Sequence, residues 1–415
     1  MKILLLLPRP LFPTNTGGRI RILNMFTRLA RHDEVHAISL ANEQADAEAM
    51  AEMRAHFHRY TPVHWNERPK FSPGFYLEFL SSRTSRYPYF LKKYLVPEFR
   101  QAIERQCARE QYDLVVCDTL PTGLVMLDSG IRPRVLFQHN VEYVIRQRHW
   151  ETETNALRKW LLRGEYEKGY LVEGEVCRSC DLVLAVSEQD RETLAREFGI
   201  AHVTAVPTGV DTDYFRPQEV AQRRGNLVFV GSMDWYPNED GIFWFVREVY
   251  PLIRRAVPYT NLTVVGRNPS GRLRALAAED TSVEITGTVE DVRPYVSRAE
   301  AVLVPLRIGG GTRIKIFEAM SMGRAVVSTT LGAEGLPVAA GREILLADEP
   351  EEFANAVAVL LRDLRRREAV AHAAREKVLR DHSWDTVTAY MRASLAALTR
   401  AGGSPIHAAE RLADG

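Results

Sequence analysis

The sequence has few cysteines, no excess of charge of one sign and no long apolar run, and each shortage excludes a class of protein. Four cysteines in 415 residues are too few for a disulfide framework, which favours a reducing compartment such as the cytoplasm. Lysine and arginine total 54 against 53 aspartate and glutamate residues, so the chain has no charge surplus for coating nucleic acid. No apolar run approaches the roughly 18 residues that span a membrane. The run Ile3–Leu7 is too short for a secretory signal and is expected to be a buried first strand.

Short apolar runs alternate with helix-sized amphipathic segments along most of the chain. This alternation is typical of βα units around parallel sheets, so the expected fold class is α/β. The strands expected in the first half are residues 3–7, 35–40, 113–117, 134–137 and 182–186. Those expected in the second half are residues 227–230, 262–265, 283–286, 301–304 and 325–328. Doubly wound sheets of this kind bind ligands beyond the carboxyl ends of their strands.

The turn-rich segment Val206–Asp211 is the expected boundary between two such domains. We expect an N-terminal domain over residues 1–206 and a C-terminal domain over residues 207–383, facing each other across a cleft. Residues 384–400 are predicted to form a helix that crosses back to the first domain. Residues 401–415 show no periodicity and are expected to be a flexible tail.

The most informative segment is 304–320, in which three glycines precede a predicted helix. Glycines let the backbone approach an anion closely, and the start of a helix offers free N–H groups. Basic residues in the first turn suit a docked diphosphate and otherwise oppose the helix dipole. Glu318 follows Lys315 on the same helix face, where its carboxylate can accept hydrogen bonds from a ribose. The candidates in this segment are Gly309, Gly310, Gly311, Thr312, Arg313, Lys315 and Glu318. The alternative is a solvated loop with an internal Lys315–Glu318 pair.

A second glycine loop, residues 8–18, follows the first strand and ends in Gly17 and Gly18. Its position is one where α/β sheets bind phosphate. It lacks the Gly-x-Gly-x-x-Gly spacing, which disfavours a dinucleotide-binding fold. Alone, the loop is equally consistent with a plain strand–turn–helix connection.

Over nearly its whole length the chain resembles a group 1 (family 4) retaining glycosyltransferase of the GT-B fold. The motifs that carry the resemblance are Gly17-Gly18, residues 206–211, residues 229–231, residues 264–266, residues 286–289 and residues 318–329. The resemblance implies two Rossmann-like domains, with a nucleotide-sugar donor on the second and the acceptor mostly on the first. It implies sugar transfer with retained configuration to a glycan or lipid-linked acceptor, in exopolysaccharide, lipopolysaccharide or glycolipid assembly. The nucleotide sugar is then a substrate, and no cofactor is expected.

By position, the resemblance assigns Glu318 to the ribose and His139, as the catalytic-site residue, to the transferred sugar. We do not expect His139 to be a general base, because a donor phosphate oxygen can take the acceptor proton in a retaining transfer. Other donor-binding positions that the resemblance implies are Gly17 and Gly18 near the phosphate, Thr288 and Val289 beside the nucleobase, and Gly266.

The chain departs from the family pattern in three places. Gly310 stands where the family has the first glutamate of Glu-x7-Glu. The Arg and Lys that usually follow the Phe-Val-Gly strand are missing from residues 231–235, and Thr208 replaces a common Asn. We infer that Arg313 and Lys315 meet the diphosphate charge instead, without a metal ion.

Two further pairs mimic metal or redox motifs. Asp211 and Asp213 have Asp-x-Asp spacing but lie in the predicted linker, where turn and cap chemistry is expected. Cys177 and Cys180 lack the second pair of a zinc site and are expected to fill small apolar helix positions.

Residues 65–100 interleave aromatic and basic side chains. That composition suits an anionic membrane surface or a lipid-linked acceptor, and thus a cytoplasmic protein held at the membrane periphery. A core-packing insertion with a solvated basic edge is the equal alternative.

Two rival functions remain open on the sequence alone. One is a nucleotide-sugar epimerase of the same architecture. The other is a non-catalytic nucleotide-sugar binder, for which Gly310 in place of a glutamate is the best support.

Overall fold

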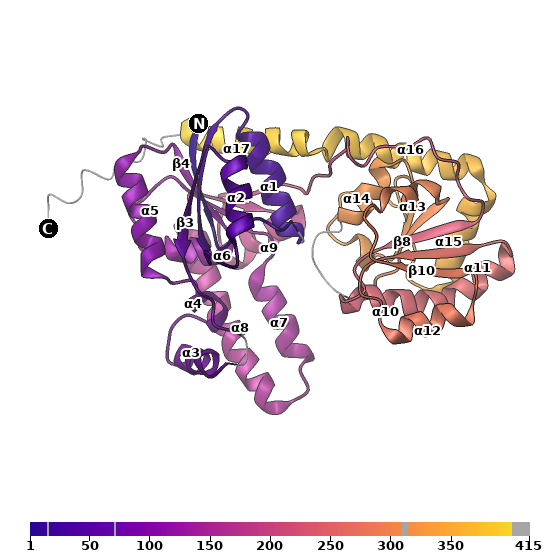
Figure 1. The fold of residues 1–415 in the computed structure, drawn as a ribbon, viewed down its shortest axis with the longest axis horizontal. Helices are drawn as coiled ribbons and strands as arrows, with labels where there is room; N and C mark the ends of the chain where they lie inside the picture. The colour runs from indigo at the N-terminus through magenta and orange to yellow at the C-terminus, as the bar shows by residue number, and fades with distance from the viewer. Residues whose placement is uncertain (15, 70–71, 309–313, 401–415) are drawn as a thin grey trace. The chain divides into compact units, whose positions relative to one another are not determined.

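A computed structural model describes residues 1–14, 16–69, 72–308 and 314–400 (Figure 1). The chain divides into two compact units. Unit 1 comprises Met1–Pro207 and the chain from Thr388 onward, and unit 2 comprises Thr208–Val387. The predicted glycine-loop residues 309–313 and the predicted tail, residues 401–415, lie outside the described residues.

Unit 1 contains a seven-stranded parallel sheet in the order β3-β2-β1-β4-β5-β6-β7. Its central strands are apolar throughout because helices cover both faces of a parallel sheet, and Ile3–Leu7 are fully buried. The strands are β1 (Lys2–Leu7), β2 (Glu34–Ala41), β3 (Arg59–His64), β4 (Leu114–Asp118), β5 (Arg134–Phe137), β6 (Leu182–Ala185) and β7 (Val203–Ala205). The helices are α1 (Gly17–Leu29), α2 (Ala47–His56), α3 (Pro73–Arg83), α4 (Tyr89–Lys92), α5 (Pro97–Arg109), α6 (Thr119–Val125), α7 (Glu142–Thr152), α8 (Ala156–Ser179) and α9 (Glu188–Phe198).

Unit 2 contains a six-stranded parallel sheet in the order β10-β9-β8-β11-β12-β13. The strands are β8 (Asn226–Val230), β9 (Asn261–Val265), β10 (Val283–Gly287), β11 (Ala301–Val304), β12 (Ala325–Ser328) and β13 (Leu345–Leu346). The helical segments are α10 (Tyr236–Trp244), η1 (Phe245–Val249), α11 (Tyr250–Ala256), α12 (Gly271–Glu279), α13 (Arg293–Arg298), α14 (Ile314–Ser321), η2 (Leu331–Ala333), α15 (Pro350–Arg362) and α16 (Leu364–Asp381). The last helix, α17 (Trp384–Arg400), begins in unit 2 and lies mostly in unit 1.

Counted within each unit, both sheets contain the strand order 3-2-1-4-5-6, and unit 1 adds a seventh strand at the end. Successive strands are added on one side of the first strand up to strand 3 and on its other side from strand 4. The reversal lies between β1 and β4 in unit 1, and between β8 and β11 in unit 2. Loops leaving two such strands diverge, and the opening between them is where ligands bind in sheets of this kind. The topology therefore directs attention to the loops after these four strands.

The chain changes unit inside α17, which is anchored to unit 1 by an ion pair with the buried carboxylate of Asp33. Arg392 Nε lies 2.6 Å from Asp33 Oδ2, and the N-terminal amine of Met1 lies 2.7 Å from Asp33 Oδ1. Burial alone would raise the pKa of Asp33, but hydrogen bonds from both cations hold it below its usual value.

The aspartates of the linker and the two cysteines at the end of α8 make contacts typical of structural residues. Asp211 Oδ1 accepts hydrogen bonds from the amides of Asp213 and Tyr214, as in a turn. Cys177 and Cys180 are both buried, with free thiols.

A buried carboxylate, Glu173 of α8, fixes the loop between β5 and α7. It accepts hydrogen bonds from Gln138 Nε2 at 2.9 Å, Glu142 N at 2.9 Å and Tyr143 N at 2.7 Å. Burial raises the pKa of Glu173 to about 8, although the two backbone donors act in the opposite direction. Residues 138 and 142 flank His139, so Glu173 determines where this loop begins and ends.

We expect Glu173→Gln to lower the free energy of unfolding by about 1–3 kcal/mol at pH 5, because an amide cannot satisfy all three donors. The unfolded side chain ionises near pH 4.5 and the folded one near pH 8, so the wild type loses stability as the pH rises between these values. The deficit of the variant should therefore shrink toward pH 8. Denaturant unfolding at several pH values measures it, with Glu175→Gln on the same helix as control. A difference that does not change with pH would contradict this role.

Candidate functional site

In unit 1, the structure brings His139 and the second glycine loop together. His139 follows β5, and its Nε2 lies 2.7 Å from Asp118 Oδ1 at the end of β4. Gly18, in the first turn of α1, lies against the imidazole: a Cβ placed there would be 3.8 Å from the ring. Gly17 begins the same helix. The loops after β1, β4 and β5 thus meet at the carboxyl edge of the unit 1 sheet.

The Asp118–His139 bond fixes the chemistry of the imidazole. A carboxylate can only accept, so Nε2 carries the proton and Nδ1 is left for another partner. The ring also stacks on Phe137, with centroids 5.0 Å apart. Asp118 was missed by sequence reasoning, although a polar residue ending an apolar strand is a usable signal.

In unit 2, a close backbone approach joins the ends of β8 and β9. Any Cβ on Gly266 would overlap the carbonyl oxygen of Gly231, so glycine is required there. The amide of Gly231 also donates to the carbonyl of Val265 at 2.9 Å. A Cβ on Gly231 would also lie 2.8 Å from Asn238 Nδ2 and from Lys315 Nζ, so both turns are closely packed at glycine.

Lys315, in the first turn of α14, reaches the turn at Gly231. Its Nζ donates to Asn238 Oδ1 at 2.9 Å and lies 4.5 Å from the centre of the Phe229 ring. Asn238 in turn donates from Nδ2 to the carbonyl of Ser232 at 2.8 Å. These contacts place the ammonium group beside Gly231.

Glu318 lies one turn further along α14 and is half-buried. Burial raises its pKa to about 7, and the nearby Lys315 cation opposes this only in part. The two side chains line a small cavity of about 10 Å³, on the scale of one water molecule. A half-buried carboxylate of this kind can accept hydrogen bonds from a ligand that displaces water.

The other predicted donor positions occupy neighbouring strand ends. Thr288 and Val289 follow β10, the edge strand beside β9, directly after Gly287 with φ +73°. Thr288 is exposed, whereas Val289 packs against the apolar core that contains Phe317. Gly309, Gly310, Gly311, Thr312 and Arg313 lie outside the described residues.

Arg267 supplies a cation that sequence reasoning missed. It follows Gly266, and its Nε donates to Ser232 Oγ at 2.7 Å and lies 3.6 Å from Asp234 Oδ2. The segment 231–235, which has no basic residue of its own, therefore receives a guanidinium from the next strand. The signal was a basic residue immediately after the glycine that ends β9.

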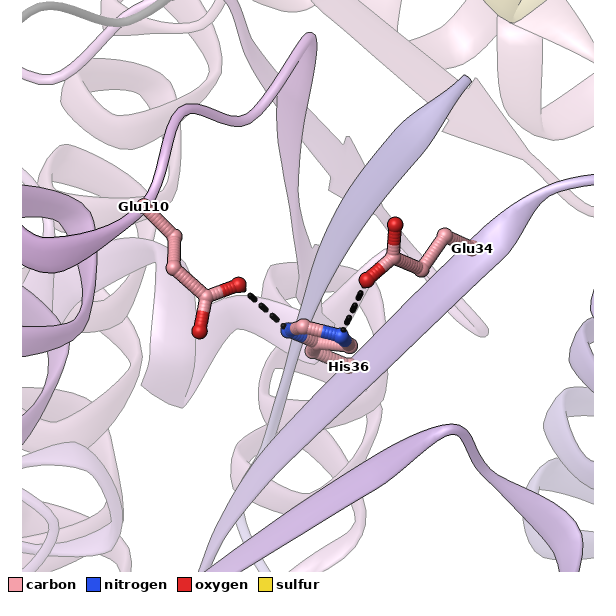
Figure 2. A group of neighbouring side chains, drawn as sticks. All are labelled: Glu34, His36 and Glu110. Carbon is pink, nitrogen blue, oxygen red and sulfur yellow. Dashed lines mark ion pairs between the residues drawn. The ribbon is translucent and has the colours of Figure 1, made fainter.

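One cluster in unit 1 has metal-ligand chemistry: Glu34, His36 and Glu110 (Figure 2). Its carboxylates are already neutralised, because Lys2 Nζ lies 3.1 Å from Glu34 Oε1 and 2.7 Å from Glu110 Oε2, and Arg59 also pairs with Glu110. Burial lowers the pKa of His36, and Glu34 opposes that shift. The cluster lies at the amino ends of β1, β2 and β4, the sheet edge opposite His139, and forms an ion-pair network.

The chain matches two protein-family models. Glycosyltransferase Family 4 matches residues 16–214, and Glycosyl transferases group 1 matches residues 224–363. A GDP-mannose-dependent alpha-(1-6)-phosphatidylinositol monomannoside mannosyltransferase of Mycobacterium tuberculosis is 30% identical over 50% of this chain and 60% of its own. An uncharacterized 44.6 kDa protein in the cps region of Klebsiella pneumoniae is 22% identical over 59% and 64%. The matches thus span less than two thirds of these relatives.

Solved structures resemble nearly the whole chain. Sucrose-phosphate synthase from Thermosynechococcus elongatus has a TM-score of 0.68 at 17% identity, covering 97% of this chain and 100% of its own. Anabaena HepE in complex with UDP has a TM-score of 0.69 at 15% identity, covering 96% and 100%. At these identities the likeness establishes the fold, and the α/β class of the GT-B type predicted from the sequence is confirmed. The two family models, which together match most of the chain, show that it belongs to the group 1 (family 4) glycosyltransferases.

Proposed function

We propose that this protein is a retaining glycosyltransferase that moves a hexosyl group from a nucleotide sugar to a glycan or lipid-linked acceptor, in polysaccharide or glycolipid assembly. The arrangement of Gly231, Gly266, Lys315 and Glu318 at one edge of the unit 2 sheet carries the proposal. It combines two closely packed glycine turns, a fixed cation and a half-buried carboxylate, which are groups suited to a diphosphate and a ribose.

In this proposal the donor diphosphate lies against the strand ends of unit 2. Lys315 is held beside Gly231 by Asn238, and Arg267 brings a second positive charge to Ser232. Glu318 accepts hydrogen bonds from the ribose hydroxyls. These charges are positioned before the ligand arrives, which reduces the free energy spent on ordering them.

His139 is proposed to bind the transferred sugar. Asp118 fixes the proton on Nε2, so Nδ1 can hydrogen-bond a sugar hydroxyl. A donor phosphate oxygen takes the acceptor proton as the glycosidic bond to the phosphate breaks. Neither a cofactor nor a metal ion takes part.

The donor nucleotide is best found by a screen, because the similar proteins differ. HepE was crystallised with UDP and the mycobacterial relative is GDP-mannose-dependent. We expect one of UDP-glucose or GDP-mannose to yield free nucleotide and a glycosylated acceptor when incubated with lipid-linked and free glycans. An epimerised sugar would support the epimerase alternative, and binding without turnover would support a non-catalytic binder.

Glu318→Ala should weaken nucleotide-sugar binding by about 1.5–3 kcal/mol, the scale of hydrogen bonds to a charged group. Because the pKa of Glu318 is about 7, its ionised form gains population from pH 6 to 8. The difference in affinity between wild type and variant should therefore widen over that range. Calorimetry measures both effects, with the exposed Glu352→Ala as control, and equal affinities for wild type and Glu318→Ala would refute the ribose role.

Transfer activity should survive EDTA, because Lys315 and Arg267 offer positive charge where a divalent cation would otherwise sit. The assay is nucleotide release before and after chelation. Activity that is lost with EDTA and restored by magnesium or manganese would show that a carboxylate pair such as Asp211 and Asp213 holds a metal.

The proposed membrane surface keeps only α3 from residues 65–100 and adds the first turns of α8. Part of that stretch packs inward: Trp65 and Phe90 pack against the core of unit 1. Its basic residues are also engaged, since Arg68 pairs with Glu78, Arg86 with Glu175 and Lys93 with Glu67. Lys70 and Phe71 lie outside the described residues.

The exposed apolar surface of this region comes from α3 and the first turns of α8, which lie side by side (Figure 1). Leu77 and Leu80 on α3 and Leu157 and Trp160 on α8 are each between 59% and 69% exposed. Arg83 lies over the Trp160 ring at 4.7 Å and joins the two helices. In the part of the chain that the structure describes, no helix is long and apolar enough to cross a bilayer. We propose that this surface, with Arg158 and Lys159 beside it, rests on anionic lipid.

We predict that the protein co-sediments with vesicles containing phosphatidylglycerol at low salt and is released at high salt, since each basic side chain near such a surface contributes about 1 kcal/mol. Leu157→Ser with Trp160→Ser should reduce binding several-fold and leave nucleotide affinity unchanged. Val359→Ser, an exposed apolar position of unit 2, is the matched control. If wild type ignores these vesicles at low salt, the acceptor is a soluble glycan and the surface has another use.

A further inference from the structure

Unit 2 contains a second cavity, of about 290 Å³, at the sheet edge opposite the donor candidates. It is lined by one face of α16 and by the residues that precede β11 and β12. Three arginines project to it: Arg324, Arg367 and Arg375. Its size is near the lower limit of small-molecule sites.

Two of these arginines have structural partners. Arg367 Nη2 lies 3.0 Å from Glu300 Oε1, and its Nη1 donates to the carbonyl of Leu360 at 2.8 Å. Glu300 is further engaged, because it accepts a hydrogen bond from the amide of Gly225 at 2.7 Å. Arg375 Nε donates to the carbonyl of Ser321, the last residue of α14, at 3.2 Å.

Arg324 differs from both. Its guanidinium makes no hydrogen bond or ion pair with any residue that the structure describes, and its Nε is buried. Burial lowers the pKa of Arg324, and the neighbouring Arg367 cation lowers it further. An unpaired cation held beside a second cation is unfavourable unless an anion joins them.

The acidic residues that line the cavity do not supply an anionic partner for Arg324. Glu300 is already shared between Arg367 and Gly225, and Glu368 lies at the exposed rim. His372, also on the rim, faces Glu376 at 3.5 Å. Positive charge therefore prevails at the inner wall of the cavity.

We propose that this cavity binds a small organic phosphate, with the phosphate group between Arg324 and Arg375. A guanidinium fork matches two phosphate oxygens, and the remaining volume accommodates a sugar-sized group. The site is separate from the donor candidates, which lie at the carboxyl ends of the strands, whereas Arg324 precedes the amino end of β12. It does not depend on the proposed transferase activity.

Calorimetric titration of the full chain with ribose 5-phosphate tests the proposal, with inorganic phosphate and unphosphorylated ribose titrated in parallel. Ribose 5-phosphate should bind and ribose should not. Saturating UDP should leave this binding in place, because UDP would occupy the donor site. If inorganic phosphate bound with equal affinity, the cavity would be an anion site that does not recognise the organic group, and that part of the proposal would be overturned.

The double variant Arg324→Gln, Arg375→Gln should weaken ribose 5-phosphate binding at least tenfold. Lys315→Gln at the donor site and Arg365→Gln on the exposed side of α16 should leave it unchanged. Arg324→Gln alone should not lower the melting temperature in phosphate-free buffer, since its guanidinium has no partner to lose. Absence of binding to wild type, displacement by UDP, or loss of binding in Lys315→Gln would each overturn the proposal.

Discussion

The close approach of the backbone at Gly266 to the carbonyl of Gly231 is the constraint on which the candidate donor site depends. It brings the ends of β8 and β9 together, because any Cβ at position 266 would overlap the carbonyl oxygen of Gly231. Ser232 can then meet Arg267 from the neighbouring strand, and Asn238 can hold Lys315 beside Gly231. A larger residue at 266 would separate the two turns and disperse the charges that surround them.

In unit 1, the candidate site residues are positioned by buried polar groups rather than by glycine packing. Glu173 fixes both ends of the loop around His139, and Asp118 fixes the ring itself. Each of these carboxylates lies on a different element, α8 and β4, so the imidazole is oriented by the folded unit as a whole. In both units, the candidate groups lie at the carboxyl ends of strands at or next to the reversal of strand order, a position that parallel sheets leave open.

The elements that the sequence predicted best are those whose signal is local. The buried strands β1, β5 and β11 follow from continuous apolar runs, and the helix carrying Lys315 and Glu318 follows from the glycines before it and Gly323 after it. Asp118 and Arg267 carried a local signal only in their positions at strand ends, and their partners could not be predicted because these lie far away in sequence or on another strand. Glu173, inside α8, gave no local signal for its role. The composition of residues 65–100 suggested a membrane surface, but composition does not reveal which rings pack inward, and Trp65 and Phe90 do.

The central claim is that a nucleotide binds at the carboxyl edge of the unit 2 sheet. A crystal structure of the protein with UDP or GDP tests it most directly. The account predicts ribose hydroxyls within hydrogen-bond distance of the Glu318 carboxylate, and the diphosphate beside Lys315 and the backbone of Gly231. A nucleotide bound elsewhere, or a ribose that does not contact Glu318, would contradict it.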